Sequence, residues 1–230
     1  MKKIILIAYA LTCTASLYAG HSKELKLTSP EGVHEVMFRQ EKISSSVNEI
    51  VYQVKYRGRE VIGNSRAGLQ LDNRTWELAL ARKINQANCW MDNLEVDSVI
   101  YQPAVDKTWH PLYGERSTIH DAYNAATMYL SKKDGSNYRL NIEVRAYDEG
   151  IAFRYFFPEH PQAIFHKVVG DLTEYTFSPG AMAWAEQWAQ APFEHLAIND
   201  IKQPVERALT VELSNGLWVA LTDADVDDWC

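Results

Sequence analysis

The sequence feature that most constrains the fold is residues 138–158, where apolar and polar side chains alternate in two successive runs. A period of two is typical of a half-buried β-strand. Asp148, Glu149 and Gly150 separate the runs with turn residues, and Pro158 ends the second run because it cannot donate to a ladder. The stretch therefore predicts an antiparallel hairpin, central to a sheet, with one face in a large core. The residues predicted to face that core are Leu140, Ile142, Val144, Ala146, Ile151, Phe153, Tyr155 and Phe157.

The rest of the chain contains short strand-like segments separated by turn residues at intervals of about 8–12 residues, which favours a large antiparallel all-β sandwich. Residues 76–84 are left open between a short helix and a strand with poor alternation. The strand candidates are residues 25–38 in two parts, 47–62, 67–71, 96–105, 126–130, 163–169, 172–177, 209–213 and 217–221.

Composition and charge narrow the class of protein. The chain has 230 residues, of which 47% are hydrophobic, so it is long enough for one large β domain or two small ones. Its formal charge of −7 argues against a nucleic-acid partner, because such surfaces are basic.

The N-terminus has the pattern of a secretory signal peptide at residues 1–19. Lys2 and Lys3 precede an apolar run, and small residues follow it, so cleavage is expected after Ala19. The run is too short to span a membrane comfortably. Cys13 raises a lipoprotein alternative, but the preceding Ala-Leu-Thr is a poor lipid-attachment context. We therefore expect a secreted or periplasmic protein.

Two further features concern the cysteines and the end of the chain. Cys89 and Cys230 remain after cleavage, and either one bridge or two free thiols is compatible with the sequence. After a buried-type strand at residues 217–221 the chain ends in Asp-Asp-Trp-Cys, which indicates an incomplete fragment.

Several motifs together resemble the N-terminal domain of glycoside hydrolase family 97, the bacterial α-glucosidases and α-galactosidases. They are TSPEG at 28–32, YQVKYRGREVI at 52–62, SRAGLQL at 65–71, WHPLYGER at 109–116 with YN at 123–124, and VRAYDEGIAFRYFFP at 144–158. The resemblance implies that residues 20–230 form a galactose-mutarotase-like β-supersandwich, truncated before a (β/α)8 catalytic barrel. It also implies that the carboxylate pair of a glycosidase lies in that barrel and not in this chain.

The same resemblance implies one metal ligand. The family binds calcium near the sugar, with one carboxylate from this domain and the others from the barrel. Glu194, within WAQAPFEHLAI, fits that position best, although Phe193 stands where relatives often carry Tyr, and Glu186 is the fallback. Without the resemblance, Glu194 reads as an ordinary surface carboxylate. Calcium takes six to eight oxygens, so one glutamate cannot complete the site.

Three other groups of residues have competing interpretations. Trp184 and Trp188 could stack on sugars, but core packing is the favoured role for a tryptophan in a sandwich. Residues 109–116 could be a packed loop, but a wall against the barrel is favoured. The charged residues of the hairpin could suggest catalysis, but structural ion pairs are favoured. Those charged residues are Arg145, Asp148, Glu149 and Arg154.

The expected function is that of a non-catalytic domain of an exported α-glycosidase. It would support the barrel, help to form the pocket for an α-glucoside or α-galactoside, and supply Glu194 to calcium. Alone it should hydrolyse nothing. The first alternative is a free-standing carbohydrate-binding module, which requires an exposed aromatic platform. The second is a sugar epimerase, which requires a His and a Glu converging in a cleft; the sequence singles out no such pair.

Overall fold

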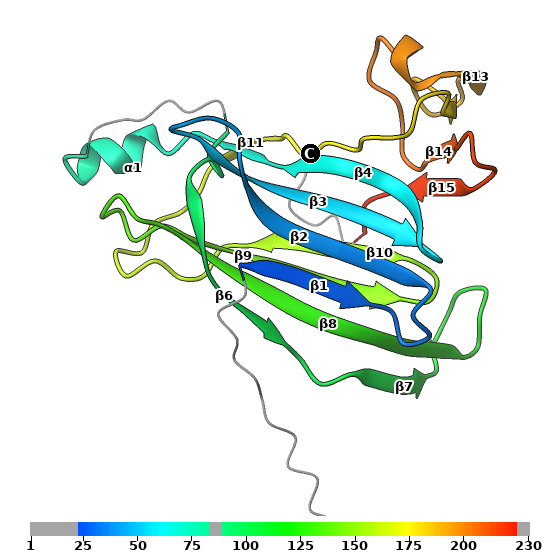
Figure 1. The fold of residues 1–230 in the computed structure, drawn as a ribbon, viewed down its shortest axis with the longest axis horizontal. Helices are drawn as coiled ribbons and strands as arrows, with labels where there is room; N and C mark the ends of the chain where they lie inside the picture. The colour runs from blue at the N-terminus through cyan, green and yellow to red at the C-terminus, as the bar shows by residue number, and fades with distance from the viewer. Residues whose placement is uncertain (1–22, 83–88, 225–230) are drawn as a thin grey trace, which may run out of the picture.

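The computed structural model describes residues 23–82 and 89–224 and shows two antiparallel sheets stacked face to face (Figure 1). The predicted signal peptide and Cys230 lie outside the described residues. The first sheet is a meander in the order β1-β2-β3-β4. Its strands are β1 (Glu24–Thr28), β2 (His34–Lys42), β3 (Asn48–Tyr56) and β4 (Arg59–Ala67).

The second sheet contains the hairpin from which the sequence argument began. Its order is β10-β9-β8-β6, and β7 pairs with the free part of β8. The prediction of a central hairpin is right for β9, which lies between two strands, whereas β10 is at the end of the order. The strands are β6 (Leu94–Tyr101), β7 (Val105–Trp109), β8 (Ile119–Lys132), β9 (Arg139–Tyr147) and β10 (Ile151–Phe156).

The predicted alternation is confirmed in the core between the sheets. Leu140, Ile142 and Ala146 are each 0% exposed. Phe38 from β2 and Tyr52 from β3 stack at 5.3 Å between ring centroids, and Phe153 from β10 meets Phe38 edge to face at 5.3 Å. Aromatic residues from both sheets therefore interlock at the centre of the sandwich.

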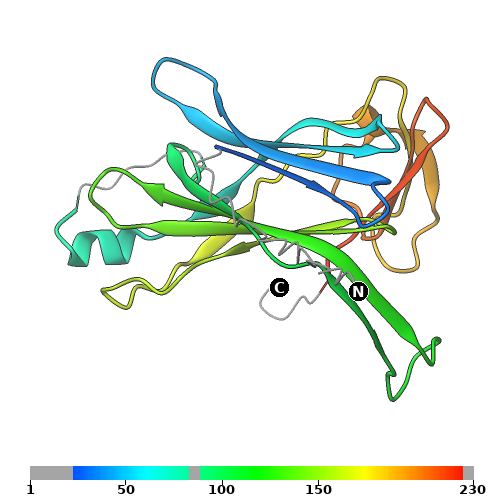
Figure 2. The ribbon, with the colours of Figure 1, turned by 60° about the horizontal axis from the view of Figure 1, so that its bottom comes forward.

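The strand-like segment at residues 96–105 was expected to end near Pro103. β6 ends at Tyr101, and β7, which the sequence did not predict as a separate strand, begins at Val105 after Pro103. Proline has no backbone N–H to donate, so pairing with β8 is interrupted there. β8 is 14 residues long, much longer than the predicted 126–130, and its first part forms with β7 an arm that projects beyond the sandwich (Figure 2).

The segment after the central hairpin is also less regular than predicted. Of the candidates 163–169 and 172–177, only β11 (Val168–Asp171) forms a ladder, with β5 (Leu69–Leu71). Residues 172–176 instead run beside β4, where Leu172 N donates to Gly68 O at 2.9 Å and Glu174 N to Arg66 O at 2.9 Å. A Cβ at Gly68 would lie 3.0 Å from Leu172 Cβ, so glycine is what permits this approach.

The described residues are mostly β in antiparallel sheets, with little helix. The ambiguous segment 76–84 begins as α1 (Arg74–Ala79), and η1 (Ile198–Asp200) is a single 3-10 turn. Cys89 is a buried free cysteine. In the described ranges, no helix has both the length and the apolar character that a membrane span requires.

A small third sheet lies at one end of the sandwich and carries the predicted metal ligand (Figure 1). Its order is β13-β12-β14-β15, all antiparallel. Ala181, Val211 and Leu213 form its buried core. The strands are β12 (Met182–Ala185), β13 (Glu194–Ala197), β14 (Leu209–Glu212) and β15 (Trp218–Leu221).

Candidate functional site

Glu194 is the first residue of β13 and lies opposite Ala185 of β12. Side chains alternate along a strand, so Glu194 shares a face with Leu196, which lies opposite the fully buried Ala183. That face is covered by residues 198–205 after β13. The covering leaves a pocket of about 190 Å³ beside Glu194.

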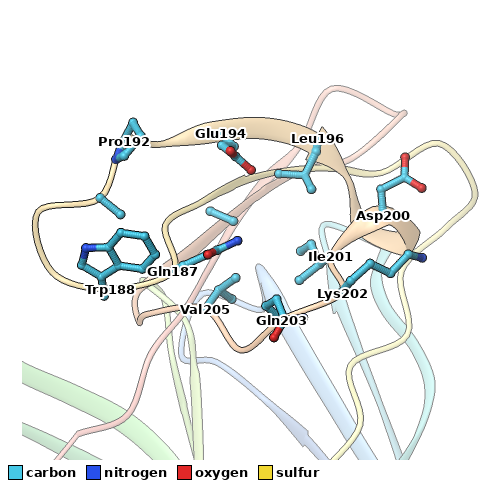
Figure 3. Close-up of a pocket in the computed structure, with 12 residues that line it drawn as sticks. Gln187, Trp188, Pro192, Glu194, Leu196, Asp200, Ile201, Lys202, Gln203 and Val205 are labelled. Atoms are coloured by element: carbon cyan, nitrogen blue, oxygen red, sulfur yellow. The ribbon is translucent and has the colours of Figure 1, made fainter.

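The pocket is bounded by the small sheet on one side and by residues 198–205 on the other. Figure 3 shows the Glu194 side chain directed into the space between them, with Gln187 across from it and Trp188 at one end. Asp200 and Lys202 point away from this space. The part of the pocket that is not strand was missed by the sequence analysis, because residues 198–205 show no periodicity.

The oxygen donors present in the pocket do not complete a calcium site. The lining side chains that carry oxygen are Glu194, Gln187, Gln203 and Asp200, of which Asp200 points away from the space in Figure 3. In residues 23–82 and 89–224, no three His, Cys, Asp or Glu side chains come together as metal ligands. Calcium takes six to eight oxygens, so this part of the chain can contribute ligands but cannot hold the ion alone.

Glu186, the fallback ligand, is not among the residues that line the pocket. Its backbone carbonyl accepts a hydrogen bond from Glu206 N at 2.8 Å, which ties the loop after β12 to the segment before β14. Of the two candidate glutamates, only Glu194, which is exposed, therefore lines this pocket.

The expectation that Trp184 and Trp188 pack in the core is wrong. Trp184 is 40% exposed and Trp188 is 57% exposed, because both belong to the small sheet and its loop, where the buried side chains are few and mostly small. Trp188 lines the pocket, whereas Trp184 lies on the other face of the sheet and stacks on His195. Trp90, which the sequence did not single out, is the tryptophan in the main core.

The loop at residues 109–116 is at the tip of the β7–β8 arm. Leu112 and Tyr113 are 100% and 89% exposed, so the alternative of a packed loop is wrong for the described chain. The wall against a barrel stays a prediction.

Three of the four charged residues of the hairpin have structural contacts, and one of these contacts is an ion pair. Arg154 Nε lies 2.7 Å from Glu143 Oε2 on the neighbouring strand. Asp148 accepts a hydrogen bond from Glu31 N at 3.0 Å, and Arg145 lies over the Tyr123 ring at 4.7 Å.

The structure also brings together a His and a Glu that the sequence did not single out. His195 Nε2 lies 3.5 Å from Glu212 Oε2. The two residues are on different strands of the small sheet, and only the register of those strands could have revealed the pair. They lie on the open face of that sheet and not in a cleft of the sandwich, so they do not match the requirement stated for an epimerase.

Comparison with known structures finds proteins of similar fold. The fold is similar to that of a glycoside hydrolase family 97 enzyme from Pseudoalteromonas sp. strain K8, solved with panose (TM-score 0.70, 21% identity, 85% of this chain and 28% of that chain). The structure of the Pseudoalteromonas enzyme with acarbose gives a TM-score of 0.69 at 20% identity, with the same coverage. A β-arabinopyranosidase crystal structure gives 0.67 at 15% identity, covering 85% of this chain and 31% of that chain.

Sequence comparison agrees with the structural comparison. The chain is 24% identical over 247 aligned residues to a retaining alpha-galactosidase of Bacteroides thetaiotaomicron, covering 100% of this chain and 32% of the relative. It therefore spans about a third of the length of that relative. The profile described as "Glycosyl-hydrolase 97 N-terminal" matches residues 27–230. This match takes in nearly the whole chain and confirms the resemblance seen in the sequence motifs: the chain belongs to the glycosyl-hydrolase 97 N-terminal family.

Proposed function

We propose that this chain is the non-catalytic N-terminal domain of an exported α-glycosidase that acts on α-glucosides or α-galactosides. Its sandwich, of the galactose-mutarotase-like supersandwich type, would support a (β/α)8 barrel that carries the catalytic carboxylates. Family membership supports the proposal, as does the threefold greater length of the relatives. Export is proposed from residues 1–19, and N-terminal sequencing of the exported protein should begin at Gly20.

Within this proposal Glu194 is a calcium ligand shared with the barrel. The observation that carries it is the position of this carboxylate, which points into a pocket beside residues 198–205 (Figure 3) and has no ion-pair partner among the described side chains. A carboxylate left free at the rim of a domain can be completed by ligands from a neighbour. A calcium ion bound there would supply charge stabilisation close to the sugar.

The test separates the supporting role from the ligand role. The isolated chain should not turn over nitrophenyl α-glucoside or nitrophenyl α-galactoside, and it should bind Ca²⁺ weakly in a calorimetric titration. In a full-length protein that includes the barrel, Glu194→Gln should weaken calcium affinity at least about tenfold, since a carboxylate ligand is lost. Glu186→Gln is the matched control and should leave the affinity unchanged.

Two results would contradict these statements separately. Turnover by the isolated chain would refute the non-catalytic role. Equal calcium affinities of the Glu194→Gln variant and the unchanged protein would refute the ligand role alone.

A free-standing carbohydrate-binding module is the second candidate, and the exposed tryptophans of the small sheet favour it. Such a module requires an aromatic platform, which Trp184 and Trp218 could provide on one face of the small sheet. It would bind sugar without any barrel, and the chain would act without a covalent partner domain. Failure of the isolated chain to bind any oligosaccharide would exclude this candidate while leaving the first intact.

A further inference from the structure

The open face of the small sheet is distinct from the face that forms the Glu194 pocket. Because side chains alternate along β13, Glu194 and His195 point to opposite sides of the sheet. Strand register places Trp184 opposite both His195 and Thr210, and places Glu212 opposite both Met182 and Trp218. The residues of this open face are Met182, Trp184, His195, Ala197, Thr210, Glu212, Trp218 and Ala220.

Two tryptophans make this face unusual for a sheet surface. Trp184 is 40% exposed and Trp218 is 56% exposed, while Val211 on the opposite face is fully buried. Exposed indoles contribute little to the stability of the domain, so two on one small face indicate a binding surface.

The polar groups beside the indoles are held in place. His195 stacks on Trp184 with ring centroids 4.5 Å apart and an interplanar angle of 17°. The other end of the imidazole lies 3.5 Å from the Glu212 carboxylate, which therefore stands between the two indoles. Side chains fixed in this way lose little conformational freedom when a ligand binds.

The spacing of the indoles suits an extended ligand. Trp184 and Trp218 are two strands and two residues apart in the register. With strands about 4.8 Å apart and a rise of about 3.4 Å per residue, their Cα atoms are separated by about 12 Å. A single monosaccharide cannot cover both rings, whereas a short oligosaccharide can.

We propose that this face binds an oligosaccharide of pyranose units. The C–H face of a pyranose is apolar and stacks on an indole, while its hydroxyls at the ring edge need donors and acceptors. Glu212 can accept hydrogen bonds from these hydroxyls, and His195 can offer a ring nitrogen. A nucleic acid is disfavoured as the ligand, because Glu212 and a formal net charge of −7 repel phosphates.

This assignment does not depend on the calcium proposal, since Glu194 serves the opposite face. It names the surface on which the second candidate function would depend, and it adds a sugar site outside the catalytic barrel to the first.

The test uses the whole chain with panose and maltohexaose as probes, measured by calorimetry and by quenching of tryptophan fluorescence. The unchanged chain should bind maltohexaose more tightly than panose, because the longer sugar reaches both indoles. Trp184→Ala and Trp218→Ala should each weaken maltohexaose binding about tenfold, which corresponds to the loss of one aromatic stacking contact.

Matched controls locate the effect. Trp109→Ala removes a similarly exposed indole from the β7–β8 arm, and Trp188→Ala removes the indole of the Glu194 pocket. Both controls, together with Glu194→Gln, should bind as the unchanged chain does. Circular dichroism must show that the variants are folded, and Trp184→Phe, which keeps an aromatic ring, should retain most of the affinity.

The proposal is overturned if the unchanged chain binds neither sugar. It is also overturned if binding is lost in Trp188→Ala or Trp109→Ala while Trp184→Ala and Trp218→Ala still bind, because the site would then lie elsewhere.

Discussion

Phe38 is the side chain whose removal should most directly test how the two large sheets are joined. It is 0% exposed on β2 and contacts Tyr52 of its own sheet and Phe153 of the other, each at 5.3 Å between ring centroids. Tyr52 and Phe153 are themselves 5.3 Å apart, so the three rings form one cluster across the interface. Phe38→Ala would leave a cavity in that cluster.

The expected cost follows from the burial. Replacing a fully buried phenylalanine by alanine costs about 3–5 kcal/mol, from lost transfer free energy and from the cavity. For a domain of this size each kcal/mol lowers the melting temperature by about 2–4 °C, so a 4 kcal/mol loss predicts a decrease of roughly 8–16 °C. This is a large share of the free energy of unfolding of a typical domain, about 5–15 kcal/mol.

Urea unfolding followed by circular dichroism would measure the change, with Phe156→Ala as the matched control. Phe156 belongs to β10 as Phe153 does, but it is 42% exposed and lies on the outer side of the sheet. Its truncation should cost less than about 1 kcal/mol. If Phe38→Ala and Phe156→Ala cost the same, the sheets do not pack through this cluster and the description of the core is wrong.

Two other substitutions concern charged and titratable groups. Arg66→Ala removes a guanidinium that lies 2.9 Å from Glu49 and 2.7 Å from Asp92, so we expect a loss of about 2–4 kcal/mol at pH 7 in urea unfolding. Burial already raises the pKa of Glu49, and a carboxyl with a raised folded-state pKa contributes less stability as pH rises. The free-energy cost of Arg66→Ala should therefore be smaller at pH 5 than at pH 8. Burial lowers the pKa of His166 to about 4, so stability should fall by roughly 2 kcal/mol, after allowing for partial exposure, as pH falls from about 6.5 to about 4. His166→Gln should abolish that dependence in urea unfolding at the two pH values, and an unchanged slope would contradict the assignment.

The sequence predicted the sandwich well where one face of a strand is buried and the other is wet. β9 satisfies this condition, and its alternation gave the correct core residues. The first part of β8 does not satisfy it, because most of its side chains in the projecting arm are only partly buried and those of its partner β7 are mostly exposed, so the apolar alternation is weak. Residues 172–177 look like a strand in the sequence, yet only a few backbone hydrogen bonds join them to residues 63–68.

The candidate site was predictable only in part. The resemblance pointed to Glu194, but the pocket depends on residues 198–205, which carry no periodic signal. The pairing of His195 with Glu212 depends on a register across β12 that no local pattern specifies. The exposure of Trp184 was mispredicted because composition favours burial of tryptophan, whereas the small sheet has too little core to cover it.

The thin core of the small sheet connects these observations to function. Its hydrophobic cluster consists of Ala181, Val211 and Leu213, to which the described strands add only the small buried side chains of Ala183 and Ala185, whereas the main core draws on both large sheets. Elements with few buried apolar contacts open most easily, and binding surfaces are commonly found on such elements. A rigid sandwich therefore holds at one end a weakly packed sheet whose inner face presents Glu194 and whose outer face presents Trp184 and Trp218. The free energy of binding a cation or a sugar there would stabilise the part of the fold that its own core stabilises least.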